Sequence, residues 1–374
     1  MPSVAERIPT RQKAVVVAEH GQVQLTEVDV PRPGSGQILV KVEAAAQSSS
    51  ESNRCADADS LHAGKTLVYA RKYGAVLGCN FAGTVVEIGV DVSEDLRTVG
   101  ERVAGFVHGG GFLRPQHCHL MHRPDKSEYV VASADIAIAI PSTWTFENAA
   151  QLGVAPFAAS QFLCQTHHFS SPSESDDENS SVSVNEDSAE DAGPEMLLVF
   201  GGATLVGLYT LQLAKLSGLR VLAACAPKHF DLLREFGADE VFDYTSPDTC
   251  MTIRAHTGGR LKRAVDVISE GRSAFQVSLA LGPEGGKVAV SRMYTSPRPG
   301  VDSCEFPAHH SPTEEDIARG RVFARHIADS VGRGILRPIP AFVLPDGLAS
   351  VSRGLDMMME GNVSVFFHFV YALR

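Results

Sequence analysis

Two glycines, Gly202 and Gly207, follow an unbroken apolar run at 196–200. Their spacing matches the outer positions of G-x-G-x-x-G, with Thr204 in the place of the middle glycine. A strand that ends in such a turn and leads into a helix leaves backbone N–H groups beside a helix N-terminus, which suits a diphosphate. We therefore predict a diphosphate seat, to which the Thr204 hydroxyl also contributes. Because the motif is incomplete, a glycine turn without a ligand is the alternative.

The segment after the next apolar run, 221–225, bears on which dinucleotide would fit. Sites that prefer NAD place Asp or Glu there to bind the ribose 2′-hydroxyl. This chain reads Ala226-Pro227-Lys228-His229, with no acid and with one lysine beside one histidine. The pattern favours the additional 2′-phosphate of NADPH.

The elements that must position these residues alternate between strand and helix from residue 196 onward. The first strand, the helix after 205 and the second strand form one βαβ unit. The sequence then predicts a short helix over 230–236, strands over 240–244, 264–269 and 287–293, and a long helix over 312–332. This order predicts an α/β, Rossmann-type doubly wound parallel sheet.

The residues before this region predict a second, barrel-like all-β domain. Short β-rich runs alternate there with turns, at 15–17, 23–30, 38–42, 81–89 and 99–105. Helical spacing follows over 146–162, in which Pro156 marks a kink or a new helix start. The tail from 341 returns to short strands around a helix over 348–359, which suggests that it rejoins the β-domain.

Composition limits the class of protein. With 374 residues, 44% of them hydrophobic, the chain is long enough for two domains with their own cores. The net charge of −11 argues against nucleic acid as a partner. Seven cysteines without paired spacing favour reduced thiols in the cytoplasm, with Cys79 and Cys225 as core thiols. Because no apolar run reaches about 18 residues, we expect no membrane association.

A run at 170–193 stands apart, since it carries eight acids and neither Lys nor Arg. Such a composition buries too little apolar surface to offset the entropy of ordering, so we predict a disordered acidic insertion over 170–194. A tolerated insertion is the favoured interpretation. A regulatory or partner-docking role is the alternative.

Two further groups of residues have both a functional and a structural interpretation. His117, Cys118, His119 and His122 are metal-ligand types, but no second cluster accompanies them, so an exposed loop is favoured and no metal is predicted. Asp266 ends a predicted strand and either orients a group in the cleft or caps a helix.

Several phrases together resemble the medium-chain dehydrogenase/reductase superfamily, and most of all its zinc-independent fungal trans-acting enoyl reductases, which serve polyketide synthases. The phrases are GCNFAGTV at 78–85, VGERV at 99–103, LGV at 152–154, GADEVFDY at 237–244 and LGPEGGK at 281–287. The resemblance covers nearly the whole chain except the acidic insertion. It implies a GroES-like β-barrel domain over 1–154, rejoined by 338–374, and an NADP-binding Rossmann domain over 155–337.

The resemblance also implies an activity. It is the NADPH-dependent reduction of an α,β-unsaturated acyl thioester that stays bound to a carrier of a polyketide or polyketide–nonribosomal peptide synthase. The expected protein is a cytoplasmic monomer. The cofactor supplies the hydride, so the protein mainly orients the cofactor and the substrate and excludes water from the site. No catalytic side chain is assigned.

Contact residues are carried over from the family by position. Those expected at the cofactor are Gly202, Ala203, Thr204, Leu205, Val206, Gly207, Ala226, Pro227, Lys228, His229, Tyr244, Leu281, Gly282, Val363 and Ser364. Leu281 and Gly282 are expected beside the nicotinamide half, and Tyr244 near the adenosine end. Those expected at the substrate are Leu152, Gly153 and Val154.

This sequence departs from the family pattern at several of these places. Asn53 stands where a cofactor-contacting Lys is usual, Ala226 replaces a Ser, and Asn80 replaces an Asp. A Lys is also missing from the phrase at 361–366. Cys79-Asn80 occupies the His-Glu position of zinc-dependent relatives, and no four-cysteine loop occurs, so catalytic zinc is not expected.

Two alternative functions stay open, of which the departures motivate the second. One is a free-standing quinone or alkenal reductase with small diffusible substrates. The other is a non-reducing member of the family that binds or cyclises a polyketide product.

Overall fold

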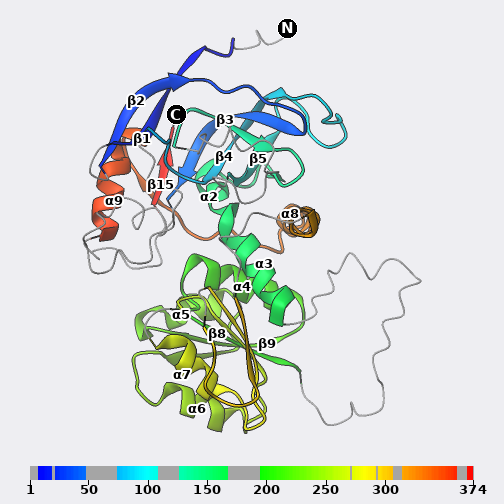
Figure 1. Cartoon of the computed structure of the whole chain (residues 1–374), viewed down its shortest axis with the longest axis vertical. Helices are drawn as coiled ribbons and strands as arrows, with labels where there is room; N and C mark the ends of the chain where they lie inside the picture. Colours follow the sequence, from blue (N-terminus) through cyan, green and yellow to red (C-terminus); the bar gives the residue numbers. More distant parts are fainter. Residues whose placement is uncertain are drawn as a thin grey trace. The chain divides into compact units, whose positions relative to one another are not determined.

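A computed structural model describes nine stretches of the chain, namely residues 7–18, 22–47, 74–107, 126–166, 194–269, 272–291, 294–305, 314–359 and 369–373. The chain divides into two compact units, Met1–Val154 with His309–Arg374, and Ala155–Ala308. Figure 1 follows both units from the blue N-terminal to the red C-terminal end. The predicted acidic insertion lies outside the described residues, apart from Pro194.

The first unit is built mainly of β-strands. Its elements are β1 (Arg11–Val17), β2 (Val23–Asp29), β3 (Gln37–Ala46), β4 (Asn80–Ile88), β5 (Arg102–Phe106), β6 (Tyr129–Ser133), β7 (Ile138–Ala139), α2 (Phe146–Ala149), η5 (Ala150–Leu152), α8 (Glu314–Gly332), β14 (Phe342–Leu344), η8 (Gly347–Ser350), α9 (Val351–Met359) and β15 (Phe369–Ala372). Within the described residues, β1 pairs with β2, and a larger sheet has the order β14-β15-β3-β4-β5-β7, with β6 also paired to β3. The all-β prediction for the N-terminal region is confirmed.

The C-terminal tail contributes directly to this larger sheet. β15 pairs antiparallel with β3, so that Val370 lies opposite Ala46 and Ala372 opposite Ala44. The prediction that the tail rejoins the β-domain is therefore confirmed. Phe369 and Tyr371 are buried, and they pack with Leu344, Leu355 and other apolar residues of α9 and β1.

The helical region after β7 has three pieces where the sequence predicted one pattern over 146–162. Thr145 accepts a hydrogen bond from the Asn148 N–H and begins α2. The chain then forms η5 and restarts as α3 (Val154–Thr166). Pro156 lies in the first turn of α3, where a missing N–H costs no helical hydrogen bond. It marks a helix start and not a kink.

The long helix α8 belongs to the first unit, whereas the sequence analysis assigned residues up to 337 to the nucleotide-binding domain. Two contacts account for its place. Arg321 on α8 forms an ion pair with Asp135, next to β7. After the helix, the Ile339 carbonyl accepts a hydrogen bond of 2.6 Å from the Gln151 side chain.

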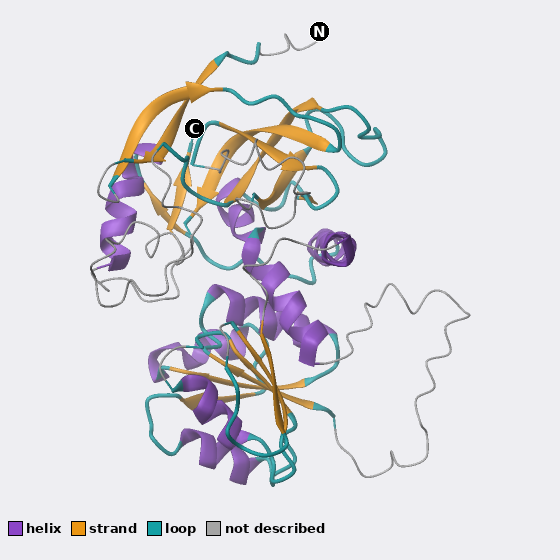
Figure 2. Ribbon diagram, viewed as in Figure 1, coloured by secondary structure: helices purple, strands orange, loops and turns teal. Residues whose placement is uncertain are grey.

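The second unit holds most of α3 and a parallel sheet with its helices. After α3 the elements are β8 (Met196–Phe200), α4 (Leu205–Leu216), β9 (Arg220–Cys225), η7 (Pro227–His229), α5 (Phe230–Glu235), β10 (Glu240–Asp243), α6 (Thr249–His256), β11 (Arg263–Asp266), α7 (Ser273–Ala280), β12 (Gly286–Val290) and β13 (Val301–Glu305). Figure 2 shows the strands gathered in the centre of this unit and the helices outside them. The sequence did not predict α6, α7 or β13.

The strand order of this sheet is β10-β9-β8-β11-β12-β13, and every pair is parallel. The chain moves outward from β8 through β9 to β10, returns to β11 on the other side of β8, and continues to β12 and β13. This is the predicted doubly wound sheet, and its order reverses between β8 and β11. Ligands of such sheets bind at the carboxyl ends of the strands beside that reversal.

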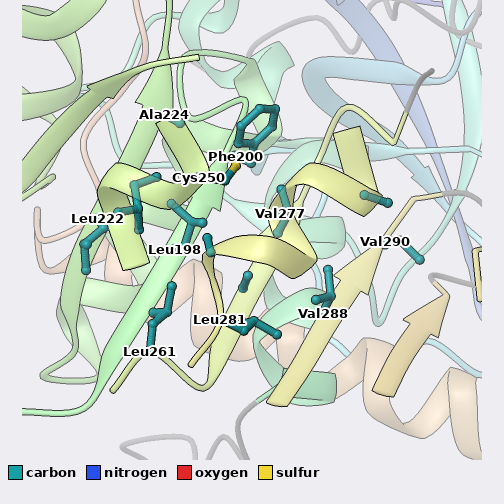
Figure 3. Close-up of a cluster of buried hydrophobic side chains, with 14 residues drawn as sticks. Leu198, Phe200, Leu222, Ala224, Cys250, Leu261, Val277, Leu281, Val288 and Val290 are labelled. Carbon is teal, nitrogen blue, oxygen red and sulfur yellow. The ribbon is translucent and has the colours of Figure 1, made fainter. Parts of the chain in front are cut away.

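One face of this sheet buries a continuous apolar layer, which fixes the strands in register. Leu198, Leu222 and Val288 come from three different strands, and α7 adds Val277 against them. Figure 3 shows these side chains converging from the strands and from α7. Strands covered on both faces read as unbroken apolar runs, which is why 196–200 shows no alternation.

Candidate functional site

The glycine turn lies at the carboxyl end of β8, beside the reversal of strand order. Gly201 has a φ of 84°, and the N–H groups of Gly201 and Gly202 donate to the Ala224 carbonyl of β9 at 3.0 and 3.1 Å. A Cβ on Gly207 would lie 2.5 Å from the Gly201 carbonyl oxygen. The start of α4 therefore approaches the turn so closely that only glycine fits at 207. These residues form a cradle of the kind that a diphosphate needs.

Thr204 has a structural role in this cradle. Its hydroxyl accepts a hydrogen bond from the Gly207 N–H at 3.0 Å and donates one to the Gly201 carbonyl at 3.0 Å. The proton that the sequence analysis expected to reach a phosphate is thus used inside the turn. Leu205 and Val206 lie in the first turn of α4, where backbone N–H groups have no intrahelical acceptor. Those two groups are the donors best placed for an anion.

The second turn lies at the carboxyl end of the neighbouring strand, β9. Ala226 is followed by the one-turn helix η7, which contains Lys228 and His229. Lys228 is exposed and His229 is half-buried. Burial, and then the charge of Lys228, hold the pKa of His229 below its usual value. This turn therefore presents one exposed lysine and one histidine at the carboxyl end of β9.

Tyr244 stands beside this second turn. It follows β10, its N–H donates to the Cys225 carbonyl at 3.1 Å, and its side chain contacts the edge of Phe200 with ring centroids 6.2 Å apart. It is 46% exposed. The structure thus brings Tyr244 to the same edge of the sheet as the glycine turn.

Cys225 and Cys79 are buried, as the sequence predicted for core thiols. Burial, with a contribution from the Asp243 carboxylate, raises the pKa of Cys225 to about 12. A thiol with so high a pKa is not a nucleophile at neutral pH.

A third turn, at the carboxyl end of β11, was missed by the sequence analysis except for Asp266. A Cβ on Gly201 would lie 2.7 Å from Ile268 and 2.8 Å from Val267, so this turn packs directly on the glycine turn. The Asp266 carboxylate accepts hydrogen bonds from the turn and from Ser273, the first residue of α7. Asp266 does not cap α7, whose N-cap residue Arg272 has no side-chain cap; it closes its own turn and bonds the Ser273 side chain. An acid at a strand end was the only signal for this turn in the sequence.

Leu281 and Gly282, which the sequence predicted beside the nicotinamide half of the cofactor, lie in the turn between α7 and β12. The Gly282 N–H donates to the Leu261 carbonyl at 2.8 Å, and Leu261 precedes β11. Arg298 donates to the Leu281 carbonyl at 3.0 Å and also to the Gly282 carbonyl. Both residues therefore lie at the amino edge of the sheet, opposite the glycine turn. Cofactors of such sheets bind at the carboxyl edge, so this placement argues against a cofactor contact, because a loop that leads into a parallel strand lies at the edge where the strand begins.

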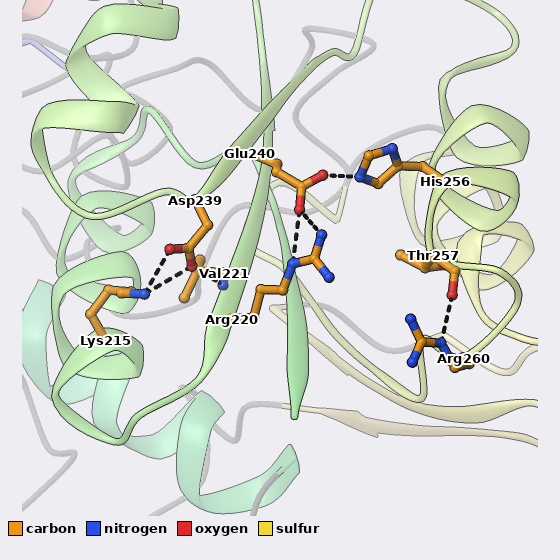
Figure 4. A network of polar contacts seen from close by, with 8 residues as sticks. All are labelled: Lys215, Arg220, Val221, Asp239, Glu240, His256, Thr257 and Arg260. Carbon is orange, nitrogen blue, oxygen red and sulfur yellow. Dashed lines mark hydrogen bonds and ion pairs between the residues drawn. The ribbon is translucent and has the colours of Figure 1, made fainter. Parts of the chain in front are cut away.

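The amino edge has its own polar network, shown in Figure 4. Glu240 pairs with Arg220 and with His256, and Lys215 pairs with Asp239 at 2.8 Å. The Asp239 carboxylate also accepts the Val221 N–H at 2.7 Å. These contacts tie β9, β10, α4 and α6 together away from the three turns, so we interpret them as structural.

Leu152, Gly153 and Val154 lie in the first unit, at the junction of η5 and α3. Leu152 is fully buried, and the Val154 N–H donates to the Asn80 side-chain oxygen at 2.8 Å. A Cβ on Gly153 would lie 2.1 Å from that same oxygen. The structure explains why glycine stands at 153. The substrate contact expected for these three residues stays a prediction.

Other expected residues lie outside the described part of the chain. These are Asn53, the cluster of His117, Cys118, His119 and His122, and the cofactor residues Val363 and Ser364. Within the described residues, no three His, Cys, Asp or Glu side chains group in a way that would hold a metal ion. In that same part, no helix is both long and apolar enough to cross a membrane.

Comparison with known proteins agrees with this architecture. The family described as "Alcohol dehydrogenase GroES-like domain" matches residues 34–142, and "Zinc-binding dehydrogenase" matches 206–307. The trans-enoyl reductase resD of Aspergillus sclerotiorum is 36% identical over 374 aligned residues, which cover 94% of this chain and 97% of that protein. This chain belongs to the trans-enoyl reductases of the medium-chain dehydrogenase/reductase superfamily. The resemblance inferred from the sequence is confirmed.

Further relatives support this membership. The trans-enoyl reductase caaB of Aspergillus niger is 36% identical over 333 residues, covering 88% of this chain and 81% of that protein. Among solved structures, the CurK enoyl reductase matches with a TM-score of 0.71 at 16% identity, over 97% of this chain and 99% of that one. The quinone oxidoreductase of Coxiella burnetii gives 0.69 at 21%, over 97% and 100%. The two structures establish the shared fold, and the family makes this chain an oxidoreductase.

Proposed function

We propose that this chain is an NADPH-dependent enoyl reductase that acts in trans on α,β-unsaturated acyl thioesters held by a polyketide or polyketide–nonribosomal peptide synthase. The observation that carries the proposal is the 36% identity to the trans-enoyl reductase resD over nearly the full length of both chains. The relatives' names supply the reaction and the action in trans. The residues of this chain supply the argument for the cofactor.

The three turns support a dinucleotide that lies along the carboxyl edge of the sheet. Gly201–Thr204 is the central turn, and the N–H groups of Leu205 and Val206 at the start of α4 would donate to the diphosphate. Lys228 lies on the β9 side and the turn after Asp266 on the β11 side. A dinucleotide that crosses the reversal of strand order places its two halves on these two sides.

Lys228 favours binding of NADPH over binding of NADH. An exposed ammonium at the end of β9 attracts a 2′-phosphate, whereas a carboxylate at this place would repel it. Asp243, at the end of β10, is already bound by the N–H and the hydroxyl of Thr245 at 2.9 and 2.6 Å. Thr245 thus holds one oxygen of that carboxylate in the turn after β10.

NADPH would supply the hydride for the reduction. The protein's residues bind and orient: the glycine cradle fixes the diphosphate, and the β11 turn borders the half that carries the hydride. The contact of Leu152, Gly153 and Val154 with the substrate, which the family resemblance implies, is part of this proposal.

The cofactor part of the proposal is tested by measuring the Kd of NADPH and of NADH for the wild type and for Lys228→Ala. A charge-assisted hydrogen bond contributes about 1.5–3 kcal/mol, so NADPH should bind at least about tenfold more weakly to the variant, and NADH within about twofold of the wild type. Lys215→Ala is the matched control, because Lys215 is a surface lysine of the same unit at the amino edge. Equal losses for the two cofactors would contradict the role of Lys228.

The substrate part is tested with a carrier-bound enoyl chain and with a simple enone or quinone as alternatives. We expect NADPH oxidation with the carrier-bound chain at much higher kcat/KM. Rapid oxidation by small diffusible acceptors alone would favour a free-standing quinone or alkenal reductase. Tight NADPH binding without turnover of either substrate would favour a non-reducing member of the family.

A further inference from the structure

Ser269 occupies a backbone conformation that a serine rarely adopts. Its φ is 47°, in the left-handed region, and only Asp91 and Asp346 share a positive φ among the described residues other than glycine. Such a conformation is unfavourable for a residue with a β-carbon and persists only where the surroundings enforce it. Strain of this kind gathers at ligand sites. Its place here is the carboxyl end of β11, beside the glycine turn.

The enforcing group is the buried carboxylate of Asp266. Its Oδ1 accepts the N–H groups of Ile268 and Ser269 at 3.1 and 3.0 Å, and its Oδ2 accepts the Ser273 hydroxyl at 2.6 Å. Asp266 is fully buried. Three hydrogen bonds to one carboxylate close the turn and join it to the first residue of α7.

The Ser269 hydroxyl extends this arrangement to the next strand. It donates to the Asp266 carbonyl at 2.7 Å and accepts the Ser291 N–H at 2.8 Å, and Ser291 directly follows β12. The carboxyl ends of β11 and β12 are thus linked through one strained residue. On its other side the turn packs on Gly201, where a Cβ would overlap Val267 and Ile268.

These contacts hold the turn through Asp266, Ser291 and Gly201, and the turn follows the carboxyl end of β11, beside the point where the sheet order reverses. In the proposed function, the adenosine half of the dinucleotide binds near Lys228, in the turn that follows β9. The other half must then lie over β11 and β12.

We propose that Asp266 and Ser269 are positioning residues for the nicotinamide–ribose half of the cofactor. Asp266 holds Ser269 in its left-handed conformation, and the turn 267–269 thereby presents a fixed surface against which that half is oriented. The inference rests on the proposed function, since it deepens the same site. It assigns a role to two residues that neither the glycine motif nor the lysine turn explains.

The test separates the two halves of the cofactor by using NADPH and adenosine 2′,5′-bisphosphate, which lacks the nicotinamide half. The variant Ser269→Ala keeps the β-carbon and loses both hydroxyl contacts. We expect the Kd of NADPH to rise about tenfold, because the turn is no longer fixed before the cofactor binds, and the Kd of the bisphosphate to change by less than about twofold. Ser278→Ala is the matched control, a buried serine of the same unit whose hydroxyl bonds the Phe275 carbonyl within α7.

Two further variants, Ser269→Gly and Asp266→Asn, show whether a loss of NADPH affinity comes from the lost contacts or from misfolding. Glycine adopts the left-handed conformation without strain, so Ser269→Gly should fold at least as well as Ser269→Ala while losing the same hydroxyl contacts and the same NADPH affinity. Asp266→Asn keeps an oxygen for the Ile268 and Ser269 N–H groups, so it should lose less NADPH affinity than the Ser269 variants.

The outcomes separate this inference from the proposed function. Unchanged NADPH affinity in both folded Ser269 variants, or an equal loss for NADPH and the bisphosphate, would overturn the positioning role. Failure of the wild type to bind the bisphosphate or NADPH would instead overturn the proposed function itself.

Discussion

The side-chain oxygen of Asn80 accepts a hydrogen bond of 2.8 Å from the backbone N–H of Val154. Asn80 begins β4, and Val154 begins α3, so a strand residue caps a helix that starts 74 positions later. Gly153 fits between them because any side chain there would meet the same oxygen. Gly153 and Val154, from the segment 152–154 that resembles the family, thus contact Asn80, which stands where the family usually has an Asp.

Removal of this cap should destabilise the protein. Asn80→Ala leaves the first N–H of α3 without its acceptor, which typically costs about 1 kcal/mol of the free energy of unfolding. Urea denaturation measures the change. Asn80→Asp is the control, since it restores an acceptor oxygen at a helix N-terminus, where a negative charge is favourable. An Ala variant as stable as the Asp variant would contradict the capping role.

Gly207→Ala should disrupt the glycine cradle. The added Cβ would lie 2.5 and 2.6 Å from the backbone oxygens of Gly201 and Gly202, so the turn must move. We expect NADPH affinity to fall by more than about tenfold, since the displaced N–H groups no longer converge on the diphosphate. Gly332→Ala provides the control, because nothing lies within 4 Å of its added Cβ. NADPH binding that survives Gly207→Ala undiminished would argue against a diphosphate at this turn.

Arg298→Leu tests the placement of the 281–282 turn at the amino edge. Arg298 donates to the carbonyls of Ser278, Leu281 and Gly282, and burial together with Arg254 lowers its pKa. Loss of these bonds should lower the free energy of unfolding by about 1–3 kcal/mol, since carbonyls at the end of α7 lose their donor. NADPH affinity in the folded variant should stay within about twofold of the wild type. A selective loss of cofactor affinity with unchanged stability would return Leu281 and Gly282 to the cofactor site.

Much of the second unit follows from local sequence. Unbroken apolar runs at 196–200 and 221–225 need only periodicity to be recognised as buried strands, and the glycine spacing marks the turn between them. The edge strand β13 was missed because Val301–Glu305 contains two acids and a serine among its five residues. A strand with one face toward solvent carries too weak an apolar signal to be distinguished from a loop.

The candidate site was predicted only where contacts are local. Lys228 and His229 directly follow a strand, so their edge of the sheet was fixed by chain direction alone. The same rule would have placed Leu281 and Gly282 correctly, because they precede a strand. The joint of Asn80 with Val154 and the link from Ser269 to Ser291 connect residues far apart in sequence, and no single-sequence pattern reveals such pairs.

Cofactor affinity should depend on pH through His229. Burial and the charge of Lys228 hold its pKa low in the free protein, and a bound 2′-phosphate would raise it. The complex then binds more protons than the free protein, so NADPH should bind more tightly as the pH falls from about 8 towards 6.5. NADH, which lacks this phosphate, should show no such trend, and His229→Asn should remove it. Parallel pH profiles for the two cofactors would place His229 away from the phosphate.

The central claim is that this chain transfers a hydride from NADPH to a carrier-bound enoyl thioester. Its most direct test uses NADPH deuterated at the nicotinamide C4 position, the unsaturated chain on its carrier, and mass spectrometry of the released acyl group. The account predicts one deuterium in the saturated product with the wild type, and strongly reduced incorporation with Gly207→Ala. An unsaturated chain recovered without deuterium, while NADPH is bound and the protein is folded, would contradict it.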